Sequence, residues 1–134
     1  MSKFYGIKFK AVIVGAIVDN AGTFLFMTVL ASALLSTGLS VDQVMNRMKN
    51  MSGLLLELIA GLGWTVLGGY VAGRMAGRAE VLQGALVAAL GMIVALIFWE
   101  GGTPVWVGIA GFAGMLPAGM GGGYLAYRRR IDLK

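Results

Sequence analysis

The stretch AVIVGAIVDNAGTFLFMTVLASALL, Ala11–Leu35, decides the fold class of this chain. A helix of about 20 apolar residues crosses the roughly 30 Å hydrocarbon core of a bilayer, at about 1.5 Å per residue. The stretch is long enough for that, so it predicts a transmembrane helix. Asp19 and Asn20 stand side by side near its middle, where a carboxyl group is costly.

Three more apolar blocks follow the first one, Met51–Gly73, Val81–Trp99 and Val105–Tyr127. Hydrophobic residues make up 58% of the chain and charged residues 13%, against about 45–50% and about 25% in soluble domains. We therefore expect an all-α, polytopic membrane protein in which residues 1–134 form a single domain of four transmembrane helices. The first block is longer than the 7–15 apolar residues typical of a signal peptide, so we expect it to be retained.

The chain lacks the residues on which most catalytic and metal sites depend. It contains no cysteine and no histidine, which excludes the usual zinc, haem and iron–sulfur ligand sets and the commonest general base. No known nucleophile or phosphate-binding motif occurs. We expect no enzyme activity, no cofactor and no bound metal.

Lysine and arginine are unevenly distributed between the two sides of the predicted membrane domain. With four crossings, nine of the 11 fall on the side of the termini and the second connection, and two fall on the other side. Basic residues of short loops collect in the cytoplasm, so both termini are predicted to be cytoplasmic. The net charge of +5 is then a topology signal and needs no nucleic-acid partner. The nine residues are Lys3, Lys8, Lys10, Arg74, Arg78, Arg128, Arg129, Arg130 and Lys134; the two are Arg47 and Lys49.

The connection between the first two blocks predicts a short amphipathic helix. Ser40 and Gln43 have the spacing of a capping box, and Val41, Val44 and Met48 recur at helical spacing after it. Such a helix is expected to lie on the outer membrane surface. A lid or a partner-docking helix is the alternative.

Small residues follow the first two predicted transmembrane helices at a spacing of four. In membranes such rows mark faces where two backbones approach closely, as in GxxxG pairs. The helices must run antiparallel, so their rows can be paired. The first row is Ala11, Gly15, Asp19 and Thr23; the second is Gly53, Glu57, Gly61, Thr65, Gly69, Gly73 and Gly77.

Antiparallel pairing of these rows predicts specific neighbours. It sets Gly15 beside Gly69 and Asp19 beside Thr65. It also sets Thr23 between Gly61 and Glu57. Asp19 and Thr65 come out about 12 Å and about 9 Å from the cytoplasmic ends of their helices, so their depths agree.

The two acids on these rows have two interpretations. In the first, Asp19 and Glu57 are protonated and hydrogen-bonded to a neighbouring helix, which makes them structural clasps. In the second, they form a proton or cation site in the membrane with Asn20, Thr23 and Thr65, because intramembrane acids are functional candidates by default.

The last two helices contribute a helix breaker and more small residues. Pro117 lies inside the fourth block, removes a backbone hydrogen bond and predicts a kink. Broken helices near the bilayer midplane often line transporter sites; a kink packed against a neighbour is the alternative. The third block carries the small residues Gly84, Ala88, Gly91 and Ala95.

The segment GGYVAGRMAGRAEVLQGALVAALG, residues 68–91, resembles a group of uncharacterised small four-helix bacterial inner-membrane proteins. The first helix of those proteins also tends to carry an acid, here Asp19. The resemblance implies a fold and a compartment and no activity.

Two functional hypotheses follow. The first is a structural or accessory subunit, packed into a homo-oligomer or a larger membrane complex through its glycine-rich helices (22 glycines). The second is a small proton- or cation-linked transporter or channel that uses Asp19 and Glu57.

Overall fold

The computed structural model describes residues 6–99 and 101–133; Lys3 and Lys134, counted above among the basic residues, lie outside them. This part of the chain is all-helical. Four of its helices, all except α2, are long and apolar enough to span a membrane, as predicted. The helices are α1 (Phe9–Ser36), α2 (Val41–Lys49), α3 (Met51–Ala76), α4 (Glu80–Ile97) and α5 (Val105–Asp132).

Short-range hydrogen bonds define the ends of α2 and α3. The predicted capping box is present. The backbone N–H of Gln43 donates to Ser40 Oγ at 3.3 Å, and the backbone N–H of Ser40 donates to the side-chain Oε1 of Gln43 at 2.9 Å. Asn50 caps α3 by accepting from the Gly53 N–H at 2.9 Å. Gly77 ends α3 with φ +65°, a conformation that costs glycine little.

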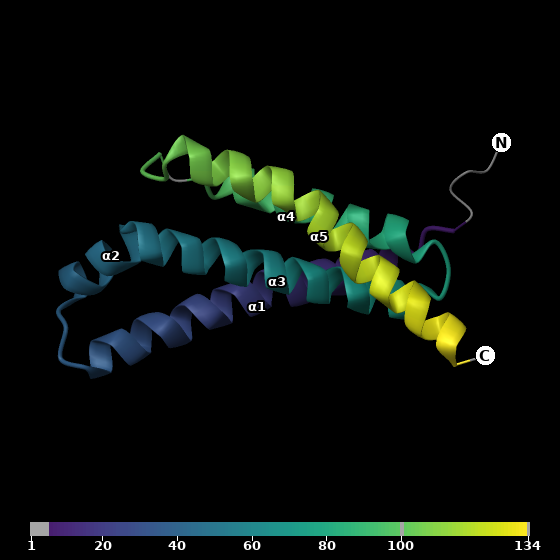
Figure 1. Ribbon diagram of the computed structural model, residues 1–134, viewed down its shortest axis with the longest axis horizontal. Helices are drawn as coiled ribbons and strands as arrows, with labels where there is room; N and C mark the ends of the chain where they lie inside the picture. The colour runs from purple at the N-terminus through teal and green to yellow at the C-terminus, as the bar shows by residue number, and fades with distance from the viewer. Residues whose placement is uncertain (1–5, 100, 134) are drawn as a thin grey trace.

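The spanning helices form two hairpins that converge at one end (Figure 1). One hairpin is α1 and α3, with α2 between them in sequence; the other is α4 and α5. Helix α3 is central and packs against α1, α4 and α5. The beginning of α1 and the end of α5 lie at the right of Figure 1, which we call the termini end, and α2 lies at the opposite α2 end.

Close backbone packing holds the termini end together. A methyl group added at Gly69 or at Gly84 would collide with the carbonyl oxygen of Gly119, and one at Gly122 would collide with that of Val66. Backbones of α3, α4 and α5 therefore touch with no side chain between them, the arrangement that small residues permit in membranes.

The predicted glycine register is wrong by one residue. Gly15 packs against Gly68 and Ala72, not against Gly69, whose nearest neighbours are the backbone atoms of Gly119 on α5. The central position of α3 explains the difference, because two neighbouring faces of this helix serve two different partners.

The other glycines of the predicted packing row divide in the same way. Gly73 lies against Ala126 of α5 and Glu80 of α4, so it packs as expected, but with those helices. At Gly61 and at Gly77, an added methyl group would have no atom within 4 Å, so neither is a packing glycine. Gly77 instead provides the left-handed turn after α3.

Polar contacts add to the glycine packing at the termini end. Arg130 Nε of α5 lies 3.0 Å from Oε1 of the buried Glu80 at the start of α4. The two groups form an ion pair, but their geometry is not that of a hydrogen bond. Arg130 also donates to the carbonyl oxygen of Gly77. Gln83 Nε2 donates to the Gly6 carbonyl oxygen at 3.0 Å.

Helix α5 continues through Pro117 without a break. Its ribbon changes direction near the middle of its length in Figure 1, where Pro117 lies. The bend fits the loss of one backbone hydrogen bond at proline.

Candidate functional site

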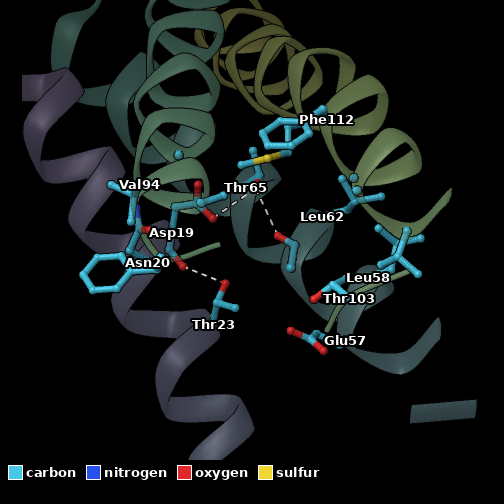
Figure 2. Close-up of a pocket in the computed structure, with 18 of the residues that line it drawn as sticks. Asp19, Asn20, Thr23, Glu57, Leu58, Leu62, Thr65, Val94, Thr103 and Phe112 are labelled. Atoms are coloured by element: carbon cyan, nitrogen blue, oxygen red, sulfur yellow. Dashed lines mark hydrogen bonds between the residues drawn. The ribbon is translucent and has the colours of Figure 1, made fainter. Parts of the chain in front are cut away.

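A cleft of about 830 Å³ opens between the two hairpins, lined by residues of all four spanning helices. Phe98, Trp99 and Thr103, at the connection between α4 and α5, are among its lining residues, so the cleft lies toward the α2 end. The structure brings to this one cleft all five residues that the sequence proposed for an intramembrane site. These are Asp19, Asn20 and Thr23 from α1 and Glu57 and Thr65 from α3 (Figure 2).

Asp19 lies where the cleft meets the packed part of the bundle. The residue is 4% exposed. Its Oδ1 accepts a hydrogen bond from Thr65 Oγ1 at 3.0 Å, which confirms the predicted contact between α1 and α3. Among the described residues, its Oδ2 has no hydrogen-bond partner although it is buried.

Thr65 connects Asp19 to the backbone of α3. Its Oγ1 lies 3.0 Å from Asp19 Oδ1 and 3.0 Å from the carbonyl oxygen of Gly61, but a hydroxyl group has a single hydrogen to donate. An ionised Asp19 accepts that hydrogen. A protonated Asp19 can donate to Oγ1 instead, and the threonine hydrogen then goes to Gly61. The same geometry therefore accommodates both protonation states.

The sequence did not single out Gly91 or Met115 for this site, but Gly91 lies beside the free oxygen of Asp19 and Met115 lies beside Gly91. A methyl group at Gly91 of α4 would lie 3.0 Å from Asp19 Oδ2 and 2.7 Å from the Cε of Met115 of α5. Gly91 thus leaves room beside the carboxyl group, and the end of the Met115 side chain borders the same space. Gly91 belongs to the small-residue row of the third block, whereas no sequence signal marks Met115.

Glu57 lines the same cleft at another level. It is exposed and lies eight residues before Thr65 on α3, about 12 Å along the helix axis toward the α2 end. Figure 2 shows it well separated from Asp19. The two acids share one cleft without forming a carboxyl pair.

Asn20 and Thr23 line the cleft but bond within their own helix. Asn20 Nδ2 donates to the Ala16 carbonyl oxygen at 2.8 Å, and Thr23 Oγ1 donates to the Asp19 carbonyl oxygen at 2.9 Å. Neither of these donors therefore bonds to the carboxyl group of Asp19 or Glu57, because each has a backbone carbonyl one turn earlier within reach.

The rest of the lining is mostly apolar, and none of the lining residues is basic. Trp99 and Phe112 stack with ring centroids 6.2 Å apart. In the described part of the chain, no group of three or more Asp, Glu, His or Cys residues is arranged to hold a metal ion. The cleft therefore combines carboxyl groups with an apolar surface.

Comparisons with protein-family models, with curated proteins and with solved structures find no match for this chain. Its function is therefore inferred from the chemistry of the cleft.

Proposed function

We propose that this chain is a small membrane transporter that binds a proton or a cation at Asp19. The observation that carries the proposal is the free, buried Oδ2 of Asp19 beside a cleft that reaches all four spanning helices. This is the second of the two hypotheses drawn from the sequence, and the cleft favours it over the first.

Approximate energies favour a binding role over a purely structural one. A hydrogen bond between membrane helices contributes about 0.6 kcal/mol on average. A buried oxygen without a partner costs about 1–3 kcal/mol, and a charge at mid-membrane costs at least about 2.5 kcal/mol. A clasp between α1 and α3 needs only Oδ1 of Asp19. A carboxyl group placed for one hydrogen bond, with its second oxygen left free, is better explained by something that binds there.

The shape of the bundle also supports transport. The cleft lies toward the α2 end, whereas the backbone of α3 packs directly against that of α5 at Gly69 and Gly122, which closes the termini end. Access from one side to a site near the middle of the helices is what an alternating-access transporter requires in one of its states.

Charge distribution supports an orientation. The termini end carries Lys8, Lys10, Arg74 and Arg78 together with the arginines that end α5, and α2 carries Arg47 and Lys49. By the positive-inside tendency, the termini end faces the cytoplasm and the cleft faces outward. The membrane we propose is a bacterial inner membrane.

Flux through reconstituted vesicles tests the proposal. The full chain is reconstituted, a proton or Na⁺ gradient is imposed, and flux is followed with a dye inside the vesicle. We expect flux in the wild type and a loss of at least about tenfold in Asp19→Asn, because an amide neither titrates nor carries charge. Asp42→Asn is the matched control, since it makes the same change on exposed residue 42 of α2, and it should leave flux unchanged. Flux that persists in Asp19→Asn, or no flux in the wild type, contradicts the proposal.

An accessory role is the second candidate, and the apolar lining of the cleft favours it. Gly61 lines the cleft, and a methyl group added there would meet no atom within 4 Å, so the α3 face is smooth enough to receive a helix of a second copy. In that case, cross-linking in the membrane should give a dimer that Gly61→Leu disrupts. A monomer at all protein-to-lipid ratios contradicts this candidate.

A further inference from the structure

We infer that the ligand of the cleft is an organic monocation, with an ammonium group that binds Asp19 and an apolar body that lies in the cleft. This inference rests on the proposed function and names the chemical class of the substrate. Three features of the cleft carry it: its charge, its lack of a metal-binding arrangement among the described residues and its apolar walls.

The charge of the lining selects a cation. Among the described residues that line the cleft, Asp19 and Glu57 are the charged ones, and none is a lysine or an arginine. The ion pair of the termini end, Glu80–Arg130, involves neither acid. Inside a low-dielectric membrane domain an anion would be repelled, whereas a cation compensates an otherwise unpaired carboxylate.

The arrangement of oxygen atoms disfavours a divalent metal ion. Calcium takes about 6–8 oxygen ligands and magnesium close to six, but Glu57 lies about 12 Å along α3 from Thr65, the residue that hydrogen-bonds Asp19. Near Asp19, the hydroxyl groups of Thr23 and Thr65 are engaged with backbone or side-chain acceptors. One free carboxyl oxygen suits one N–H donor of an ammonium group.

The walls of the cleft suit an apolar, aromatic-sized body. A volume of about 830 Å³ lies within the range of roughly 300–1,000 Å³ found for small-molecule sites. Phe24 lines it from α1, Phe112 from α5, and Trp99 from the connection that follows α4. Apolar surface of the ligand buried against these side chains stabilises the complex by about 25 cal/mol per Å².

Asp19 Oδ2 is within reach of such a ligand after a small side-chain movement. Oδ2 is buried, and the terminal methyl of Met115 on α5 lies, like Oδ2, within about 3 Å of the space that a side chain at Gly91 would fill. Methionine is unbranched and has three rotatable bonds, so it changes rotamer easily. Because Gly91 adds no side chain, moving Met115 opens space directly beside Oδ2.

Binding of matched probes tests the inference. The full chain in lipid nanodiscs is dialysed against radiolabelled 2-phenylethylammonium at pH 7, with protein-free nanodiscs as the background. Two comparison probes divide the ligand into its parts: n-propylbenzene has a methyl group in place of the ammonium group, and methylammonium lacks the apolar body. We expect saturable binding of 2-phenylethylammonium and at least about tenfold weaker binding of each comparison probe. Equal binding of n-propylbenzene, equal binding of methylammonium, or no saturable binding of 2-phenylethylammonium overturns the inference.

Substitutions locate the ammonium group at Asp19. Asp19→Asn should weaken binding at least about tenfold, and Asp42→Asn should not change it. Gly91→Ala keeps every charge but puts a methyl group 3.0 Å from Oδ2, so it should also weaken binding while circular dichroism and gel filtration stay as in the wild type. Wild-type affinity in Asp19→Asn or in a folded Gly91→Ala protein overturns the assignment.

The same protein samples separate this inference from the proposed function. Asp19-dependent proton or Na⁺ flux without binding of 2-phenylethylammonium overturns the ligand class and leaves the transporter in place. Asp19-dependent binding of 2-phenylethylammonium without flux of protons or Na⁺ supports the ligand class and overturns transport of a proton or Na⁺.

Discussion

Neighbouring glycines of α5 differ in what surrounds them. A methyl group at Gly122 would collide with the carbonyl oxygen of Val66 and lie 2.8 Å from the amide nitrogen of Tyr70, both backbone atoms of α3. At Gly121 no atom lies within 4 Å of that position. The two residues therefore separate the effect of close backbone packing from the effect of helix propensity.

We predict that Gly122→Ala destabilises the protein and Gly121→Ala does not. At Gly122, α3 and α5 must move apart, and overpacking costs about 1–3 kcal/mol. At Gly121, replacing glycine by alanine in a helix should be neutral or favourable by up to about 1 kcal/mol. The free energy of unfolding in mixed detergent micelles measures both effects. Equal stabilities of the two variants would mean that α3 and α5 do not pack through Gly122.

At Asp19 the sequence predicts one part of the site and misses the other. Matching depths on two antiparallel helices predict the contact with Thr65, because both residues belong to spanning helices that follow one another in the chain. Gly91 and Met115 come from the second hairpin, and nothing in the pattern of residues sets the rotation of that hairpin about the first.

The elements themselves are readable from the sequence. Apolar blocks long enough to cross a bilayer become α1, α3, α4 and α5 because a membrane-spanning backbone must satisfy its hydrogen bonds internally. The capping box at Ser40 predicts the start of α2. Which helices pack against each other is harder to predict from the sequence. Because α3 is central, small residues of one row on it, such as Gly69 and Gly73, contact several helices.

We predict that α2 and the end of α5 lie on opposite sides of the membrane. The chain has no cysteine, so Asn46→Cys and Asp132→Cys, both at exposed positions, each provide a single labelling site. In intact cells a membrane-impermeant maleimide should label the variant at position 46, and the variant at position 132 should be labelled only after permeabilisation. Labelling of both in intact cells would exclude four crossings, and the reverse pattern would invert the proposed orientation.

The two hairpins separate toward the α2 end because of how small and large residues are distributed over the whole molecule. This separation depends on where the small residues that allow close packing lie: Gly68, Gly69, Gly84, Gly119 and Gly122 all lie toward the termini end. Toward the α2 end the facing residues of the cleft are larger, among them Phe24, Leu58 and Phe112. The cleft follows from this distribution only once the helices are placed, and for that reason the sequence did not predict it.

Arg130 connects the two hairpins at the termini end, because it pairs with Glu80 of α4 and donates to the carbonyl oxygen of Gly77, which ends α3. Arg130 is near the end of α5 and Glu80 begins α4, and their side chains are 39% and 5% exposed. Because the arginine is partly in water, the pair contributes about 1 kcal/mol or less. An energy of that size changes the ratio of two conformations by about fivefold.

We therefore predict that Glu80→Gln makes the cleft more accessible from the termini end. The reporter is Val94→Cys, since Val94 lines the cleft and the chain has no other cysteine (Figure 2). In oriented vesicles, the reporter alone should react with an impermeant maleimide mainly from the α2 side. Adding Glu80→Gln should raise its reaction rate from the termini side by up to about fivefold, because the amide keeps the size of the side chain and loses the charge that attracts Arg130. Asp132→Asn is the control, because it removes an exposed acid of the same end and should leave both rates unchanged. A rate from the termini side that is the same with and without Glu80→Gln would show that the ion pair does not hold that end closed.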